Sequence, residues 1–485
     1  MRGFLARPAG KCLALWVVGV YALLSVLGWP APQNLHAFTL SEEQALGRKV
    51  LDQVREHYNL IEDGEVISYI QAVGKRVSAQ LGTTPYDFQF FVIDDPTLNA
   101  FAVPGGYVFI YRGLIEIMGN EGELASIIGH ELGHIEAHHM EQRISKGRVL
   151  NIATIAAVLA GALLGGGGEG SQALIASAMA GSQSLQLQYS RENENEADQL
   201  GFRSLCAAGY DPTSMLTMMQ RLQHSRWSNI SRSNDYLSTH PATTERIQNI
   251  DSLIQAHSKD AVHKQPVGDF AMMQAALLSD YTDKAVALER FDSWAKEEGK
   301  AAAAAYGKGR VYLRFGEPAL AVPLLQEAAR LKPDSPMILS ALGYAYFQNG
   351  LVAQAQRTFQ TALLLDPNAA IVHYRLGLVL KDQGNGADAL KQFQLAEPLA
   401  ASLPEIDYQM GVVLGQTDQI GLAHYYLGRY YKHQRDIQTA MFHFNKAKAL
   451  LADSPDKLKE VEEALKEMKG GDKVKWQSPF EKRIR

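Results

Sequence analysis

The chain of 485 residues is long enough for two to four domains, and its 46% hydrophobic and 20% charged residues are typical of a globular protein. Its net charge of −5 is mild. No basic patch indicates a nucleic-acid partner, and no acidic tract indicates a disordered chain.

The N-terminus has the pattern of a secretory signal. Three basic residues precede an uncharged apolar run over residues 12–29, which Pro30 and Pro32 end. We therefore expect a signal peptide over residues 1–37, with cleavage after Ala37, and a periplasmic location. The apolar run is also near the minimum length of a membrane span, so an uncleaved inner-membrane anchor is the alternative.

Two helices and then two strand segments are expected after the signal. Apolar residues recur at helical spacing between residues 41 and 81, with a break at Asp63-Gly64. Residues 88–93 have the composition of a strand, and so do residues 99–112, which a Pro104-Gly105-Gly106 turn divides. The sheet they form is small.

The second strand segment is expected at a sheet edge, because proline cannot donate a hydrogen bond within a sheet. An edge strand can hold an extended peptide by backbone pairing, which gives Ala102, Val103, Gly105 and Gly106 a predicted role in substrate binding. An ordinary hairpin explains the same residues equally well.

The central motif is His130-Glu131-Leu132-Gly133-His134. Asn120, followed three residues later by Glu123, has the pattern of a capping box and predicts a helix that runs through the motif. On a helix, His130 and His134 face the same side and can supply half of a tetrahedral zinc shell. Glu131 can then act as the base that accepts a proton from water.

Two glycines lie within this predicted helix, at positions 129 and 133. Each lowers helix propensity by about 1 kcal/mol relative to alanine. They are more easily explained if another backbone, or a bound peptide, approaches the helix closely.

A segment rich in alanine and glycine, residues 150–180, follows. Its mostly apolar part, residues 150–164, is too short for a confident membrane span. We expect a buried helical hairpin, and the alternatives are a mobile lid or a hairpin at a membrane surface.

The motif helix needs a third metal ligand, and the next predicted helix offers one. Glu194 and Asp198 lie four residues apart on one helix face, with the small Ala197 allowing close approach. Glu194 can bind zinc while Asp198 accepts the free ring N–H of a liganding histidine. His138 and His139 are rivals for the third position, although His138 shares the helix of the first two histidines.

Together these motifs resemble the zinc peptidases related to HtpX, Oma and the CAAX prenyl proteases. The resemblance covers roughly residues 40–255. It implies one zinc ion per chain held by His130, His134 and Glu194, with Glu131 as catalytic base and Asp198 supporting a ligand. Unlike HtpX, the sequence lacks several long transmembrane helices, which points to a secreted soluble branch. The motifs that carry the resemblance are His130 to His134, Asn99-Ala100-Phe101 with Pro104-Gly105-Gly106, and Ser190-Arg191 with Glu194, Ala197 and Asp198.

A His-Pro segment at His240-Pro241 resembles the one that follows the acidic helix in this family. We expect His240 to approach the zinc or its bound oxyanion, and Arg246 to position the substrate or the acidic helix. A loop histidine that only caps a helix is the alternative for His240.

The C-terminal 200 residues contain a repeat of 34 residues, marked by Gly309, Gly343 and Gly377. Alanines and aromatic residues recur with the same period, which is typical of tetratricopeptide repeats. Such repeats stack into a helical solenoid that binds peptides or proteins. We expect this solenoid over residues 266–470, followed by a flexible basic tail over residues 471–485.

The fold class expected is therefore mainly α. A gluzincin-type zinc metallopeptidase domain with a small β-sheet spans residues 38–265, and the α-solenoid follows it. This combination resembles the BepA family of Gram-negative periplasmic proteases. The resemblance implies degradation of misfolded outer-membrane β-barrel proteins, chaperone-like help to their assembly, and docking of the repeats on the barrel-assembly machinery. The alternative function is a chaperone or scaffold with a latent metal site, or a membrane-anchored quality-control protease.

Overall fold

The computed structural model describes residues 39–146, 156, 189–227, 236–257, 266–399 and 403–470. The expected signal or anchor, almost all of the segment 150–180, and the basic tail lie outside the described residues. Within the described part, no helix is both long and apolar enough to cross a membrane.

A three-stranded sheet forms the base of the N-terminal part, in the order β1-β3-β2. β1 (Gln89–Ile93) runs parallel to β3 (Tyr107–Tyr111), and β2 (Ala100–Val103) runs antiparallel to β3. Gly105 and Gly106 connect β2 to β3 with φ angles of 92° and 89°, a conformation that favours glycine. The strand order places β2 at a sheet edge, as expected for this segment, but β3, its second half, is the central strand.

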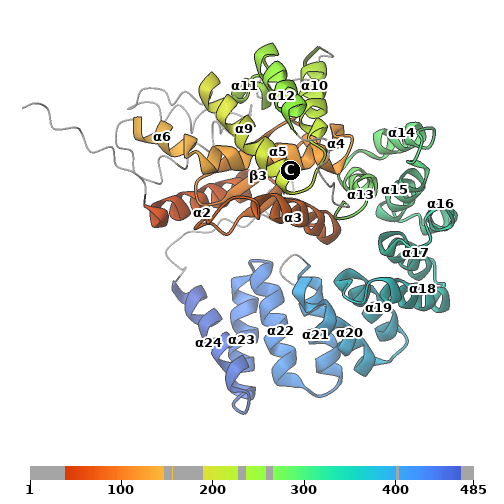
Figure 1. The fold of residues 1–485 in the computed structure, drawn as a ribbon. Coiled ribbons are helices and arrows are strands. Elements are labelled where there is room, and N and C mark those ends of the chain that lie inside the picture. Colours follow the sequence, from red (N-terminus) through yellow and green to blue (C-terminus); the bar gives the residue numbers. More distant parts are fainter. Residues whose placement is uncertain are drawn as a thin grey trace, which may run out of the picture.

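Helices surround this sheet, and α5 lies against it at the centre of the domain (Figure 1). The expected apolar faces of α2 and α3 are buried. The helices of this part are α2 (Leu40–His57), α3 (Gly64–Ser78), α4 (Arg112–Ile117), α5 (Glu121–Glu136), α6 (His139–Lys146), α9 (Arg191–Ala207), α10 (Thr213–Trp227), α11 (Tyr236–Thr239) and α12 (Thr244–Ala256).

The cap of α5 differs from the expected capping box in one half. The Asn120 side chain accepts a hydrogen bond from the Glu123 backbone N–H, as expected. The Glu123 carboxylate, however, accepts from the backbone N–H of Gly119 instead of Asn120, at 2.7 Å. It also accepts from Thr217 and Arg221 of α10, so tertiary contacts have drawn it away from the local motif.

α5 and α9 cross at very short distance. A Cβ atom added to Gly133 would lie 2.8 Å from the backbone oxygen of Ala197, and one added to Gly129 would lie 3.0 Å from that of Gly201. The close approach that these glycines predicted is therefore made by the backbone of α9. It places the motif histidines beside the acidic helix.

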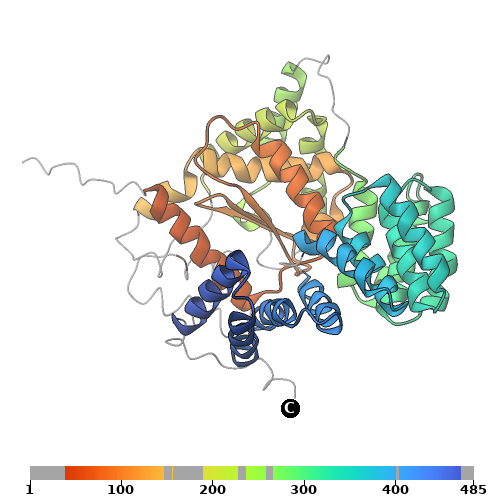
Figure 2. The ribbon, with the colours of Figure 1, turned by 90° about the horizontal axis from the view of Figure 1, so that it is seen from below.

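The C-terminal part is a solenoid of paired helices that curves so that α21 to α24 lie beneath α2 and α3 (Figures 1 and 2). Gly309, Gly343 and Gly377 each face a large side chain of the paired helix, which explains their period. The mainly α fold is thereby confirmed. Its helices are α13 (Phe270–Tyr281), α14 (Lys284–Trp294), α15 (Ala301–Arg314), α16 (Pro318–Leu331), α17 (Pro336–Gln348), α18 (Val352–Leu365), α19 (Ala370–Asp382), α20 (Gly386–Ala396), α21 (Glu405–Gln416), α22 (Ile420–His433), α23 (Ile437–Leu450) and α24 (Pro455–Gly470).

A buried ion network joins the two parts. Arg310 of α15 binds Asp63 at 3.0 Å and Glu65 at 2.6 Å, both at the start of α3, and also binds Asp280. Gln274 of α13 donates to the backbone oxygen of Ile115 at 2.8 Å. The first repeat is thus fastened to the domain that carries the motif.

Candidate metal centre

Four side chains from three segments converge beside the α5–α9 crossing. The Nε2 atoms of His130 and His134 lie 3.1 Å apart. The Glu194 carboxylate of α9 lies 3.6 Å from His130 Nε2 and 3.5 Å from His134 Nε2. His240, just after α11, places Nδ1 2.9 Å from Glu194 Oε1. One donor atom from each residue falls within a common span of 4.8 Å, and all four side chains are buried.

The donor set suits a metal ion in its chemistry. Imidazole nitrogens and a carboxylate are the ligands that zinc binds in proteins, and they bind in their deprotonated forms. Burial holds the pKa of His134 well below its usual value. Burial alone would raise the pKa of Glu194, but His240 and the two motif histidines outweigh it and lower that pKa. Both groups are therefore held in the state that a metal requires.

A second layer of contacts orients His130. Its Nδ1 lies 2.9 Å from Asp198 Oδ1, as the four-residue spacing from Glu194 had predicted. Burial opposes a charge on His130, but Asp198 outweighs it and raises the pKa of the ring. Arg246 donates two hydrogen bonds of 2.7 Å to Asp198 and lies 2.5 Å from Glu194. Both contacts are with side chains of α9, the acidic helix, and the role of Arg246 stays a prediction.

Tyr236 is a site residue that the sequence reasoning missed. Its hydroxyl donates a hydrogen bond of 3.0 Å to Glu131 Oε1, and its ring stacks on His240 with centroids 4.6 Å apart. Burial raises its pKa well above the usual value, so the phenol stays protonated as a donor. Its spacing of four residues from His240 was the only available signal.

The rival ligand His139 lies behind His134 instead of beside the donor atoms. Its Nδ1 is 2.9 Å from His134 Nδ1, and its Nε2 is 3.2 Å from Glu196 Oε2. The ring of Tyr189, also missed, stacks on His134 at 3.9 Å. His134 is therefore held from two sides.

The predicted substrate-binding residues occupy β2 and the turn after it. Ala102 and Val103 are buried. A Cβ atom on Gly105 would lie 2.8 Å from the backbone oxygen of Glu43 in α2, so the chain itself makes this close approach. Among the described residues, the donor cluster includes none of the four, and their role stays a prediction.

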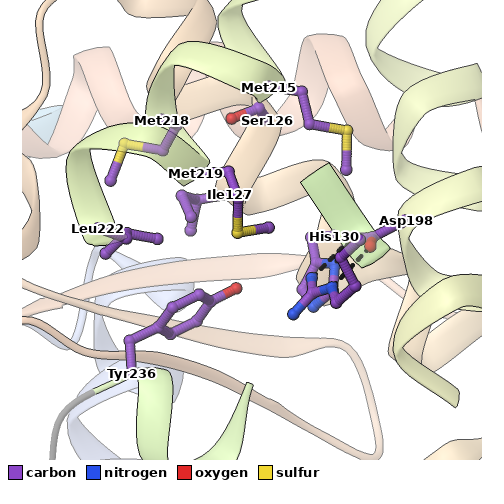
Figure 3. Close-up of a pocket in the computed structure, with 10 residues that line it drawn as sticks. Ser126, Ile127, His130, Asp198, Met215, Met218, Met219, Leu222 and Tyr236 are labelled. Carbon is purple, nitrogen blue, oxygen red and sulfur yellow. Dashed lines mark hydrogen bonds and ion pairs between the residues drawn. The ribbon is translucent and has the colours of Figure 1, made fainter. Parts of the chain in front are cut away.

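A small cavity of about 20 Å³ lies beside His130. Figure 3 shows the side chains of Met215 and Met219 extending toward His130, with Tyr236 below them. Its apolar lining comes from Ile127, Met215, Met218, Met219 and Leu222.

Comparison with known proteins finds a family match in each of the two parts of the chain. Residues 66–254 match the family described as peptidase family M48, and residues 273–336 and 340–404 match tetratricopeptide repeats. This part of the chain is therefore similar in sequence to the M48 peptidases. The chain combines this domain with a repeat solenoid, as the resemblance had implied.

Several curated relatives are similar to the chain in sequence. The chain is 32% identical over 312 residues to a "putative beta-barrel assembly-enhancing protease" of Vibrio cholerae, covering 63% of each chain. It is 28% identical over 262 residues to the "beta-barrel assembly-enhancing protease" of Escherichia coli, covering 53% of each. A "mitochondrial metalloendopeptidase OMA1" of Schizosaccharomyces pombe is 30% identical over 201 residues, 40% of this chain and 57% of that one. The matched regions span less than two thirds of these relatives.

Several solved structures are similar to part of the chain. The structure titled "YrrB: a TPR protein with an unusual peptide-binding site" covers 40% of this chain at 22% identity, with a TM-score of 0.29.

Proposed function

We propose that the chain is a zinc-dependent endopeptidase. The observation that carries the proposal is the convergence of His130, His134 and Glu194 within reach of one ion, with Glu131 on the same helix. A bound zinc would supply the Lewis acid that activates water at neutral pH.

The surrounding residues support specific roles. Glu131 would accept the proton of the attacking water, and Tyr236 holds its carboxylate in place. Asp198 and Arg246 fix the ring of His130 and the position of Glu194. His240 lies between Glu194 and Glu131, with Nε2 3.8 Å from Glu131 Oε1, where it can reach either the metal or the reacting oxygen.

The substrates proposed are misfolded or stalled proteins of the periplasm, outer-membrane β-barrel proteins first among them. This rests on relatives whose names state that they enhance β-barrel assembly. The repeats are proposed to dock on the barrel-assembly machinery and to give chaperone-like assistance. A periplasmic location follows from the N-terminal signal pattern in the sequence.

The test is zinc content together with cleavage of casein, comparing the wild type with Glu131→Gln. About one zinc at this centre in both proteins, with cleavage by the wild type alone, is the expected result. No zinc bound through His130 and His134 in either protein would overturn the proposal. His240→Ala should change cleavage or zinc affinity, and a variant unchanged in both would assign His240 a merely structural role.

A latent metal site in a chaperone or scaffold is the second candidate, and burial favours it. His130, His134, Glu194 and His240 are only 2–3% exposed, so a peptide needs an opening movement to reach them. Full activity of Glu131→Gln in β-barrel assembly, with loss only on deletion of residues 266–470, would support the scaffold. Loss of that activity in Glu131→Gln would support the protease.

A further inference from the structure

A second group of potential ligands lies outside the centre just described. Glu43 of α2, His138 at the end of α5 and Glu141 of α6 bring one donor atom each within 4.8 Å of one another. Figures 1 and 2 both place α6 on the same side of the molecule as the first turns of α2. The group therefore spans three segments that meet at one corner.

Glu141 is the unusual member. It is 8% exposed, and neither of its carboxylate oxygens has a hydrogen-bond partner within the described residues. The Nδ1 atom of His138 lies 3.8 Å from Glu141 Oε1. A buried carboxylate without such partners is costly, because the charge has lost its water.

The neighbouring carboxylate of Glu43 adds to the free-energy cost of burying a charged Glu141. It is 5% exposed, and one of its oxygens accepts a hydrogen bond of 2.5 Å from the Tyr86 hydroxyl. Burial and the nearby Glu43 together raise the pKa of Glu141 to about 7. Two buried carboxylates facing each other need either a shared proton or a cation between them.

We propose that Glu43, His138 and Glu141 form a second zinc site, distinct from the centre at His130 and His134. One imidazole nitrogen and two carboxylates are three ligands of the kinds that zinc binds. The His138 side chain is 55% exposed, which leaves room for water as a fourth ligand. The ion would fasten α2 to the corner between α5 and α6, directly after the motif helix.

The test is zinc bound per full-length chain after equilibrium dialysis against zinc chloride, measured by elemental analysis. Wild type should hold about one zinc more than Glu141→Gln and about one more than His138→Ala. Glu56→Gln is the matched control, because it makes the same change at an exposed position of α2, and it should equal the wild type.

The difference in bound zinc between the wild type and these variants tests the second site, whatever amount of zinc the centre at His130 binds. His138→Ala changes a largely exposed side chain, so it tests the site even if Glu141→Gln fails to fold. Equal zinc in wild type and His138→Ala would overturn the proposal and leave a shared proton between the two carboxylates.

Discussion

The crossing of α5 and α9 can be tested by substituting Gly133 with alanine. The added methyl would lie 2.8 Å from the Ala197 oxygen, whereas ordinary contacts begin at 3.4 Å. The two backbones must therefore separate by about 0.6 Å, the difference between these distances. Ala197 lies between Glu194 and Asp198, so the same movement displaces both carboxylates from the histidines.

The expected effect falls on function more than on stability. Alanine gains about 1 kcal/mol of helix propensity over glycine, which offsets part of the roughly 1–3 kcal/mol that overpacking costs. A misplacement of about 1 Å at a reacting centre can cost about 100-fold in rate. For the smaller shift here we expect casein cleavage to fall by about tenfold, with weaker zinc binding.

Two other glycines provide a graded comparison. Gly129→Ala meets the Gly201 oxygen at 3.0 Å and should have a smaller effect, while a Cβ atom on Gly82 meets nothing within 4 Å and Gly82→Ala should behave as wild type. Cleavage rate and zinc affinity are measured for all three variants. Wild-type values of both for Gly133→Ala would refute the argument that this crossing sets the position of the acidic ligand.

Three further predictions concern buried polar groups. Tyr236→Phe removes the hydrogen bond to Glu131 and should slow casein cleavage by about tenfold at unchanged zinc content, a result that a merely structural role would not give. Arg246→Gln removes the buried guanidinium that is paired with the carboxylate of Asp198 and should lower the free energy of unfolding in a chelator by about 3 kcal/mol, measured by urea denaturation; an unchanged midpoint would contradict this. Burial raises the pKa of Asp407 from 3.8 to about 6, so its protonated form stabilises the repeats below pH 4 and this contribution is lost as the pH rises through 6. Relative to Asp407→Asn, the wild type should lose up to about 3 kcal/mol between pH 4 and pH 7 in parallel denaturant titrations, and a pH-independent difference would refute the assignment.

The elements of the fold could be predicted because each depends on residues close in sequence. Helical spacing of apolar residues gave α2, α3 and α5, and a period of 34 residues gave the solenoid. The grouping of His130, His134 and Glu194 was also predictable, since two of them share one helix turn and the third lies on a face that needs a partner. The spacing of residues defines which side chains share a helix face. Few helices in this sequence carry a face with acidic residues that could meet the two histidines.

Tyr236 and His139 could not be assigned in the same way. Tyr236 reaches Glu131 from 105 positions away along the chain, and no pattern within the sequence relates the two. His139 follows His138, whose positive φ of 52° changes the direction of the chain after α5. This change of direction brings the ring of His139 against that of His134. A continuous helix would have carried His139 to a different face, so its position depends on this turn in the backbone after the motif.

The glycines of α5 show how far local reasoning extends. Their cost to the helix predicted that something approaches closely, and the structure supplies the backbone of α9 at Ala197 and Gly201. We could infer that α9 approaches these glycines only because Glu194 and Asp198 also require α9 to lie close to α5. Glu194 needs that position as a third metal ligand, and Asp198 needs it to accept the ring N–H of a histidine. Where packing and chemistry require one contact independently, sequence alone specifies a tertiary arrangement. Where a contact serves only one purpose, as the hydrogen bond from Tyr236 to Glu131 does, the sequence alone does not specify it.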